Sequence, residues 1–423
     1  MVRYLRKHYR HLRETDELTK GRPDDYIPPL PVPVVWRLPL IPEQARVQPH
    51  MKALIASPYY SGVGGLQKYT YRIAVGLHHA GVDTTVITCS RVLDESGPTV
   101  FTLPRLATVS NTPFSLRWFG SIKRVIDEVD PDVVNGFLPV PYMADVAARV
   151  TRDRPFVLTY LNDAVGINAT TKLLVKAYYR FLGRGTIRRA RWIITTSQHY
   201  AARSPFLQGY LSKTSAVPPG VDVATFNPTV DSGHIRDKYC LDGHVILFVG
   251  QLSKSHRHKG LPILIRALRS LDPSVTLVVV GDGNWRSHYA TYARRIGVQD
   301  RVVFVGLIPD EEMPLYYRGA DLTVLPTLTD AEGFGMVLAE ANACGRPVIG
   351  TNVGGIPSVI QDRYNGLVVQ PGDLHGLVEA IRAVLSDEEL ADRMGHNGYQ
   401  RVKSEFTWTQ AIARTMGVYD GLI

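Results

Sequence analysis

The residues with the clearest chemical potential are two glutamates eight positions apart, Glu332 and Glu340. Gly333-Phe334-Gly335 follows the first of them and predicts a tight turn into a helix. Amides at the start of a helix attract anions, so we expect those of Phe334 and Gly335 to face a phosphate. Glu340, two turns into this helix, could accept hydrogen bonds from sugar hydroxyls. A solvated helix face is the alternative, but the small apolar neighbours indicate tight packing.

Two further segments connect a predicted strand to a predicted helix and could bind phosphate. Ser61-Gly62-Val63-Gly64-Gly65 is glycine-rich, which lets the backbone approach a ligand closely. Gly250-Gln251-Leu252 leads into His256-Arg257-His258-Lys259-Gly260, where Lys259 and Arg257 could neutralise a diphosphate. An ordinary turn and a solvated basic loop are the alternatives. A metal at the two histidines is disfavoured, because no carboxylate or thiol stands beside them.

The elements that must position these residues are short apolar strands alternating with amphipathic helices from Met51 onward. This pattern predicts an α/β fold with parallel sheets covered on both faces. A polar segment at 227–243 separates two such series, so we expect two doubly wound, Rossmann-like domains facing a central cleft. The expected strands are 51–57, 85–88, 133–134, 156–160 and 192–196, then 244–249, 275–280, 302–305, 322–325 and 348–350; the expected helices include 66–80, 261–271 and 285–296. Ligands bind beyond the carboxyl ends of such strands, where the segments above lie.

Length and composition exclude several other classes of protein. The chain has 423 residues, enough for two domains, and its 45% hydrophobic content is ordinary for a globular protein. Three cysteines cannot form a disulfide framework. No apolar run reaches the roughly 18 residues of a membrane span, and no secretory signal is recognisable. We therefore expect a soluble, cytoplasmic protein. Residues 1–50, basic and then proline-rich, predict an extension rather than a domain.

The net charge of +9 is concentrated in two segments, residues 1–22 and 172–213. The second carries nine lysines and arginines and no acid, which favours an anionic partner. Its predicted helix mixes Leu173, Leu174 and Phe181 among the cations, which is typical of docking on an anionic membrane or a phosphorylated acceptor. A solvated cationic face is the alternative. Nucleic acid is disfavoured, because no known binding module surrounds the segment.

The Glu332–Glu340 segment and its continuation Gly345–Pro357 resemble the nucleotide-sugar site of the retaining glycosyltransferases of family 4, which have the two-domain GT-B fold. The similarity runs from Met51 to the C-terminus and includes Pro218-Pro219-Gly220-Val221-Asp222, Gly281-Asp282-Gly283 and Phe406-Thr407-Trp408. It implies an acceptor-side domain of residues 51–225, completed by the last helix, 406–423, which crosses back onto it. Residues 226–405 would form the nucleotide-sugar-binding domain.

The resemblance implies roles for the residues beside the donor phosphates. Gly64 and Gly65 would approach the phosphates from the first domain. Lys259, with Arg257 as the weaker candidate, would offset negative charge on the leaving diphosphate. No metal is required, because these cations and the helix N-termini can stabilise that charge.

It also implies roles around the sugar and the base. Glu340 would hold the ribose hydroxyls, and main-chain groups near Leu307 would lie beside the base. Glu332 would contact the transferred sugar, next to the amides of Phe334 and Gly335. The reaction would move a hexosyl unit from a UDP- or GDP-type sugar to a hydroxyl with retained configuration, and nothing identifies Glu332 as a nucleophile.

The acceptor implied by the resemblance is a lipid-linked or polysaccharide intermediate, with a small molecule as the alternative. The enzyme would then work in the cytoplasm, peripherally at the inner face of the membrane. The base, the sugar and the linkage stay open.

Two residues depart from the family pattern. Relatives often have histidine where Leu161 stands, close to the transferred sugar, and Asn162 or Asp163 would have to take its place. Relatives also often have arginine at Gln251, so Arg257 and Lys259 would carry more of the phosphate charge. Both departures support a second hypothesis, a weakly active nucleotide-sugar-binding subunit that scaffolds an assembly.

Overall fold

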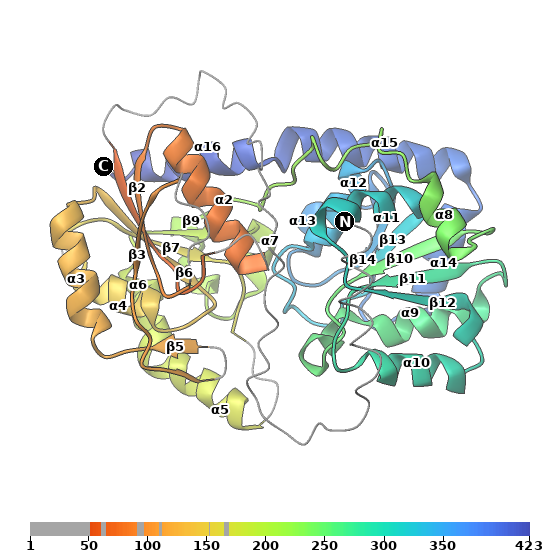
Figure 1. The fold of residues 1–423 in the computed structure, drawn as a ribbon, viewed down its shortest axis with the longest axis horizontal. Coiled ribbons are helices and arrows are strands. Elements are labelled where there is room, and N and C mark those ends of the chain that lie inside the picture. The colour runs from red at the N-terminus through yellow and green to blue at the C-terminus, as the bar shows by residue number, and fades with distance from the viewer. Residues whose placement is uncertain (1–50, 61–64, 91–96, 110–111, 152, 165–168) are drawn as a thin grey trace, which may run out of the picture. The chain divides into compact units, whose positions relative to one another are not determined.

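The computed structural model describes residues 51–60, 65–90, 97–109, 112–151, 153–164 and 169–423. The extension predicted at 1–50 and the predicted donor-binding residue Gly64 lie outside the described residues. The described chain forms two parallel sheets with helices packed on them (Figure 1). We refer to the part built on each sheet as the first half and the second half.

The first half contains a seven-stranded sheet in the order β3-β2-β1-β6-β7-β8-β9, and all neighbouring strands are parallel. The strands are β1 (Lys52–Ala56), β2 (Asp83–Thr88), β3 (Thr99–Thr102), β6 (Val133–Leu138), β7 (Phe156–Tyr160), β8 (Trp192–Thr195) and β9 (Thr214–Ala216). A separate antiparallel hairpin consists of β4 (Ala107–Val109) and β5 (Thr112–Phe114). The helices are α2 (Gly65–His79), α3 (Trp118–Val129), α4 (Met143–Val150), α5 (Ala169–Tyr178), α6 (Arg184–Arg189) and α7 (Gln198–Arg203), with a π-helical turn at Tyr179–Gly183 and a 3-10 helix at Gln208–Lys213.

Alternation along β1 explains why helices cover both faces of the first sheet. Successive side chains of a strand point to opposite faces. Ile55 packs in one apolar cluster with Ile73 of α2, whereas Leu54 packs in another with Ile122 of α3 and residues of α4. Because both faces are buried, the strand is apolar after its first residue, Lys52, as the sequence indicated.

The second half contains a six-stranded sheet in the order β12-β11-β10-β13-β14-β15, again parallel throughout. Its strands are β10 (Val245–Val249), β11 (Thr276–Val280), β12 (Val302–Gly306), β13 (Leu322–Leu325), β14 (Val348–Thr351) and β15 (Gly366–Val369). Its helices are α8 (Gly233–Tyr239), α9 (Leu261–Ala267), α10 (Arg286–Arg295), α11 (Met313–Gly319), α12 (Met336–Ala343), α13 (Ile356–Val359), α14 (Leu374–Leu385) and α15 (Glu388–Glu405), with short 3-10 helices at Lys254–Lys259, Leu268–Ser270, Gln299–Arg301 and Asp310–Glu312. Figure 1 shows α8, α11, α12 and α15 on one side of this sheet and α9 and α10 on the other.

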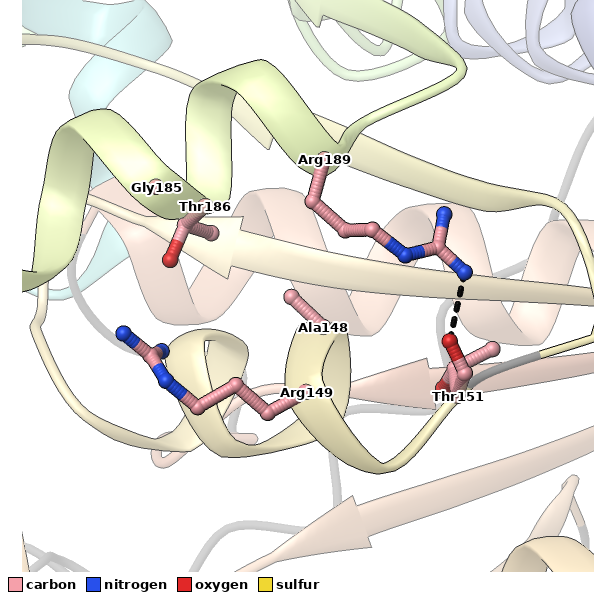
Figure 2. A pocket seen from close by; sticks show the side chains of 6 residues that line it. All are labelled: Ala148, Arg149, Thr151, Gly185, Thr186 and Arg189. Carbon is pink, nitrogen blue, oxygen red and sulfur yellow. Dashed lines mark hydrogen bonds between the residues drawn. The ribbon is translucent and has the colours of Figure 1, made fainter.

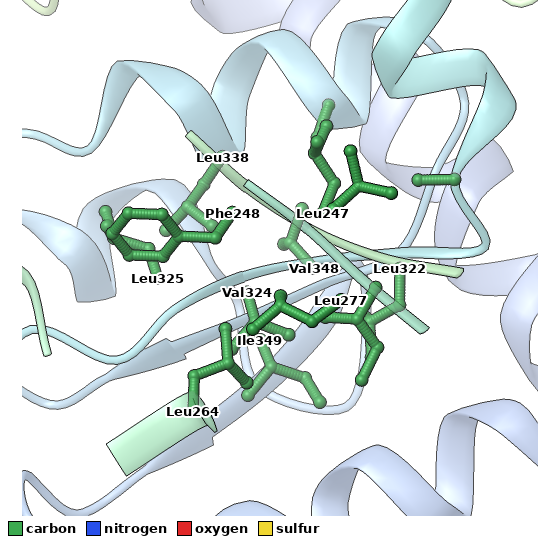
Figure 3. Close-up of a cluster of buried hydrophobic side chains, with 14 of the residues drawn as sticks. Leu247, Phe248, Leu264, Leu277, Leu322, Val324, Leu325, Leu338, Val348 and Ile349 are labelled. Atoms are coloured by element: carbon green, nitrogen blue, oxygen red, sulfur yellow. The ribbon is translucent and has the colours of Figure 1, made fainter. Parts of the chain in front are cut away.

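One continuous apolar core holds the second half together (Figure 3). Leu247 and Phe248 of β10 point to opposite sides of the sheet, and leucines of α9 and α12 pack there with the neighbouring strands. The core therefore fixes the strand ends from which the loops of the candidate site emerge.

The last helix, α16 (Trp408–Asp420), packs on α2 in the first half. The chain crosses back where Val221 N donates to Phe406 O at 2.7 Å. A Cβ on Gly220 would lie 2.2 Å from the Trp408 nitrogen, so only glycine permits this approach. Two segments singled out in the sequence therefore lie against each other. The domain boundary at residues 225 and 226 stays a prediction.

The predicted strands and helices of both series are confirmed. Strands β3, β9 and β15, the hairpin strands β4 and β5, and several helices, among them α3, α4, α14 and α15, were not predicted. Strands β3, β9 and β15 lie at edges of their sheets, where a strand has a single neighbour and needs little apolar character, and β3 is exposed at both ends. The helix expected at 261–271 also changes to 3-10 geometry at Leu268.

Candidate active site

Lys259 and Glu332 form an ion pair beyond the carboxyl ends of strands in the second half. Lys259 Nζ lies 2.7 Å from Glu332 Oε2, and their side chains are only 17% and 15% exposed. Lys259 ends the 3-10 helix after β10, and Gly260 follows with a φ of +77°. A Cβ on Gly260 would lie 1.9 Å from Pro326 O, so glycine is required there. The structure thus brings together two residues that the sequence assigned to phosphate and sugar.

The charge state of Glu332 follows from these neighbours. Burial alone would raise its pKa, but the ammonium of Lys259, through its charge and its hydrogen bond, together with His258 and His256, holds the pKa below the ordinary value. Burial and the charge of Lys259 lower the pKa of both histidines. The lowered pKa leaves the Glu332 carboxylate ionised at neutral pH.

The start of α12 is built as the sequence predicts. Gly335 precedes the helix with a φ of +96°, a conformation that favours glycine. Phe334 is buried and packs edge-on against Phe406, with ring centroids 5.4 Å apart. This contact ties the turn to the segment where the chain crosses between the halves.

Glu340 is the fifth residue of α12, so it lies about one turn from the helix start and not two as expected. Its Oε2 accepts a hydrogen bond of 2.8 Å from the hydroxyl of Tyr317, in α11. Burial raises the pKa of Glu340, and Lys68 of α2 acts in the opposite direction. Lys68 also forms a 3.2 Å ion pair with Asp310, which connects the first half to the second.

The loop after β7 is held by a network of hydroxyl groups around Asp163. Its Oδ1 accepts hydrogen bonds from Tyr160 at 2.6 Å and from Ser204 at 2.7 Å, and its amide donates to the Tyr200 hydroxyl. Burial raises the pKa of Asp163, and these hydrogen bonds oppose the shift. The loop contacts the Glu332 turn, because a Cβ on Gly333 would lie 2.5 Å from Leu161 O.

Helix α7 of the first half holds the Glu332 turn through contacts that sequence reasoning missed. Thr196 Oγ1, just before the helix, donates to Gly333 O at 2.5 Å, and His199 Nδ1 donates to Gly354 O at 2.9 Å. Arg203 Nε lies 3.0 Å from Asp330 Oδ1. The one feature of the sequence that could have pointed to these residues is their position, because they follow β8 at the carboxyl edge of the sheet.

Three other predicted donor-binding residues lie at exposed positions. Gly65 begins α2, and Arg257 is exposed on the 3-10 helix that ends at Lys259. The Leu307 side chain is 74% exposed, which is compatible with the main-chain role expected near it. In the part of the chain that the structure describes, no hydrogen bond or ion pair joins Arg257 or Leu307 to the side chains of Lys259 and Glu332. All site roles assigned from the sequence stay predictions.

A pocket of about 360 Å³ lies elsewhere in the first half, between α4 and α6 (Figure 2). Arg189 Nη2 donates at 2.5 Å to the carbonyl of Thr151, the C-cap of α4, and cations commonly satisfy carbonyls at helix C-termini. Arg149 Nη1 donates at 2.8 Å to Asp145 O, one turn earlier in the same helix. Both arginines therefore have carbonyl partners within the protein.

Within the described ranges, no group of three or more His, Cys, Asp or Glu side chains is placed to hold a metal ion. Metal independence stays a prediction. The described helices also include none that is long and apolar enough to span a bilayer.

Comparison with known proteins decides the family. Residues 63–225 match the family described as Glycosyltransferase Family 4, and residues 236–401 match Glycosyl transferases group 1. The chain is 30% identical to the O-antigen chain mannosyltransferase C of Escherichia coli, over 86% of this chain and 96% of that relative. The chain belongs to the family 4 glycosyltransferases.

Two further relatives of this glycosyltransferase extend the comparison. The GDP-mannose-dependent alpha-(1-6)-phosphatidylinositol monomannoside mannosyltransferase of Mycobacterium tuberculosis is 31% identical over 69% of this chain and 77% of that protein. The structure of sucrose-phosphate synthase from Thermosynechococcus elongatus matches with a TM-score of 0.64 and 26% identity, over 87% of this chain and 97% of that one. The two parallel-sheet halves therefore form a GT-B fold.

Proposed function

We propose that this glycosyltransferase moves a hexosyl unit from a nucleoside-diphosphate sugar to a hydroxyl acceptor with retained configuration. The observation that carries the proposal is the buried Lys259–Glu332 pair, with Lys68, Thr196 and Arg203 of the first half contacting the second half around it. A cation for the diphosphate and a carboxylate for the sugar are thereby held beside each other.

When the donor binds, Lys259 and Glu332 each exchange their mutual ion pair for a contact with the donor. The diphosphate takes the ammonium of Lys259, and the amides at the start of α12 add further donors. Glu332 is then free to accept hydrogen bonds from hydroxyls of the transferred sugar. Glu340, kept in place by Tyr317, holds the ribose hydroxyls.

The transfer step needs no covalent enzyme intermediate. The acceptor oxygen attacks the anomeric carbon from the side of the leaving group, and the bond between that carbon and the phosphate oxygen breaks. The acceptor proton passes to the departing phosphate. Lys259 and the amides stabilise the charge that develops there, so we propose that no metal is required.

The acceptor that we propose is a lipid-linked or polysaccharide intermediate. Support comes from the names of two relatives, one acting on the O-antigen chain and one on a phosphatidylinositol mannoside. Because one of them is GDP-mannose-dependent, GDP-mannose is the first donor to test.

We propose that the enzyme attaches peripherally to an anionic membrane through residues 172–213. In α5, Lys172 and Lys176 are exposed together with Leu173 and Leu174. A basic helix that exposes leucines suits the interface between headgroups and acyl chains. Co-sedimentation with vesicles tests this, and binding that ignores the content of anionic lipid contradicts it.

The donor site is tested by calorimetric titration with UDP, GDP and ADP in the presence of EDTA. We expect one nucleotide to bind the wild type and to bind Glu340→Ala much more weakly. Glu389→Ala is the matched control, because Glu389 is a highly exposed glutamate of the same half. If no nucleotide binds the wild type, the enzymatic proposal fails.

The scaffold hypothesis is the second candidate, and Leu161 favours it, because a leucine cannot bond a sugar hydroxyl. Leu161→His distinguishes the two. A large gain in transfer indicates a decayed site, whereas no change or a loss indicates a rearranged and active one.

A further inference from the structure

Large apolar side chains are exposed in a second segment of the first half, outside the basic stretch. Leu106 and Leu116, which flank the hairpin of β4 and β5, are 72% and 73% exposed. Val109 of β4 and Phe119 at the start of α3 are exposed as well. Singly exposed apolar residues are common, but a group of them marks an interaction surface. We call these four residues the hairpin group.

The hairpin group lies at the same edge of the first sheet as α5. The hairpin follows the end of β3, and α5 follows the end of β7, so both leave the carboxyl edge of a parallel sheet. Figure 1 shows β5 and α5 in the same region of the first half.

Contacts at the start of α4 connect the two segments. The Tyr142 hydroxyl donates to Ser115 O, and its ring packs edge-on against Phe114 and Phe119. The Tyr142 amide donates to Asp145 Oδ2 at 2.7 Å, and the hydroxyl of Tyr178, from α5, donates to Oδ1 of the same carboxylate at 3.3 Å. Tyr142 and Asp145 thus join the hairpin group to α5.

Cations predominate beside the apolar side chains of both segments. Residues 97–124 contain Arg105, Arg117, Lys123 and Arg124 and no acid, although Lys123 pairs with Asp127 further along α3, and residues 172–213 contain nine cations and no acid. Arg105 and Arg117 are exposed beside Leu106 and Leu116. Apolar side chains flanked by cations match an anionic lipid surface, where leucines enter the acyl boundary and cations meet the headgroups.

We propose that the hairpin group is a second insertion point into an anionic phospholipid bilayer, acting beside α5. The inference rests on the proposed peripheral attachment and gives it two anchors instead of one. Two anchors, unlike one, fix how the first half is oriented on the membrane.

The test is vesicle co-sedimentation of the full chain and of the double variant Leu106→Glu/Leu116→Glu. Vesicles contain phosphatidylcholine with or without phosphatidylglycerol. We expect wild type to need phosphatidylglycerol and the double variant to lose roughly tenfold or more in affinity, because two inserting leucines are replaced by charges. Tyr364→Glu, an exposed apolar position in the second half, is the matched control and should bind as wild type does.

A second measurement reports insertion itself. The variant Leu106→Trp should show a blue-shifted emission increment with vesicles containing phosphatidylglycerol and quenching by brominated lipid. Unchanged binding by the double variant, or an introduced tryptophan whose emission ignores vesicles, overturns the proposal. Nucleotide titration without vesicles, on the same variants, checks their folding. If no nucleotide binds the wild type, the transferase proposal fails, but the vesicle measurements still decide whether the hairpin group binds the membrane.

Discussion

The ammonium of Lys259 and the carboxylate of Glu332 share a short hydrogen bond where little water reaches either group. In such surroundings, removal of one partner leaves the other charge buried without compensation, which costs more than the pair itself contributes. Sequence reasoning identified both residues and gave them separate ligands. It could not predict that they meet, because they are 73 positions apart and their contact depends on how two loops of one sheet edge are packed.

Substitution of Glu332 tests this account through its pH dependence. We expect Glu332→Gln to lower the free energy of unfolding by about 1–3 kcal/mol at neutral pH. Because the folded pKa of Glu332 lies below its ordinary 4.5, the stabilisation is fully present above that pH and is lost as the pH falls through the folded value. Urea unfolding at a series of pH values should show the difference shrinking in acid, whereas a constant difference contradicts the ion-pair account. Glu389→Gln should change little at any pH.

Lys259 is expected to act on the leaving group. Lys259→Ala should lower the rate of sugar transfer by about 10²–10³-fold, the range observed when a stabiliser of developing charge is removed. Lys259→Arg should recover part of the rate, because the charge is retained. The control is Lys254→Ala, an exposed lysine on the same 3-10 helix, and equal losses in both variants would exclude the assigned role.

At the scale of elements, the turn between β13 and α12 carries Glu332 and is shaped by Gly335. The positive φ of this glycine directs the chain into the helix, and a Cβ there would be in ordinary van der Waals contact, 3.4 Å from Ile356 and Leu338. A side chain at this position is therefore strained by its backbone conformation.

Alanine at Gly335 should lower the free energy of unfolding by about 1–3 kcal/mol and weaken nucleotide binding. Alanine at Gly417 should instead raise the free energy of unfolding. Gly417 lies inside α16, and apart from the backbone of the helix itself no described atom lies within 4 Å of its Cβ position, so Gly417→Ala should stabilise the fold by about 0.5–1 kcal/mol. Thermal unfolding of the two variants measures both effects, and the same sign for both contradicts the argument.

Helix α7 is expected to position the Glu332 turn through Arg203. The Arg203–Asp330 pair is substantially exposed, so Arg203→Ala should change the free energy of unfolding by less than about 1 kcal/mol. Transfer should nevertheless slow roughly ten- to a hundredfold, because the turn is held less firmly. If Arg203 only positions the turn, Arg203→Ala should lower kcat and leave the nucleotide affinity nearly unchanged, and Arg203→Lys should restore part of kcat. A residue that binds the nucleotide would instead change the affinity. Arg363→Ala, at an exposed arginine, should leave kcat unchanged.

Sequence patterning predicted most strands of the two sheets, because their residues form short apolar runs. The strands β10 and β11 are apolar almost throughout, which a buried parallel strand requires. Edge strand β9 has three residues and no such run, so it could be recognised only from its pairing with β8. The α7 contacts were likewise beyond prediction, because they join residues more than 120 positions apart.

At the scale of the whole molecule, α16 makes the first half discontinuous in sequence. Trp408 is buried there, edge-on to Tyr69 with ring centroids 6.0 Å apart and beneath the guanidinium of Arg72. The hydroxyl of Tyr419 accepts a 2.7 Å hydrogen bond from the Asn135 amide, in β6. The sheet of the first half therefore depends on the last residues of the chain.

Trp408→Ala should lower the free energy of unfolding by about 3–5 kcal/mol, the usual cost of truncating a buried large aromatic residue. Hydrogen exchange should accelerate most in β1 and β6, which face α16, and less in β10 and β11. Trp408→Phe should lower the free energy of unfolding less and accelerate hydrogen exchange less in each of these strands. Equal acceleration in both sheets would contradict the assignment of α16 to the first half.

The return of α16 also determines when each half can be completed on the ribosome. The first sheet is synthesised first, yet the apolar cluster that it forms with Ile73 and Leu77 of α2 is complete only after Tyr419 of α16 has left the exit tunnel. The second sheet, made later, already has all of its strands and the residues of its core when Phe406 emerges. Domains generally fold in the order of their synthesis. Here the order of completion is reversed, because the core of the earlier sheet lacks its α16 side chains until residues 408–420 have been made.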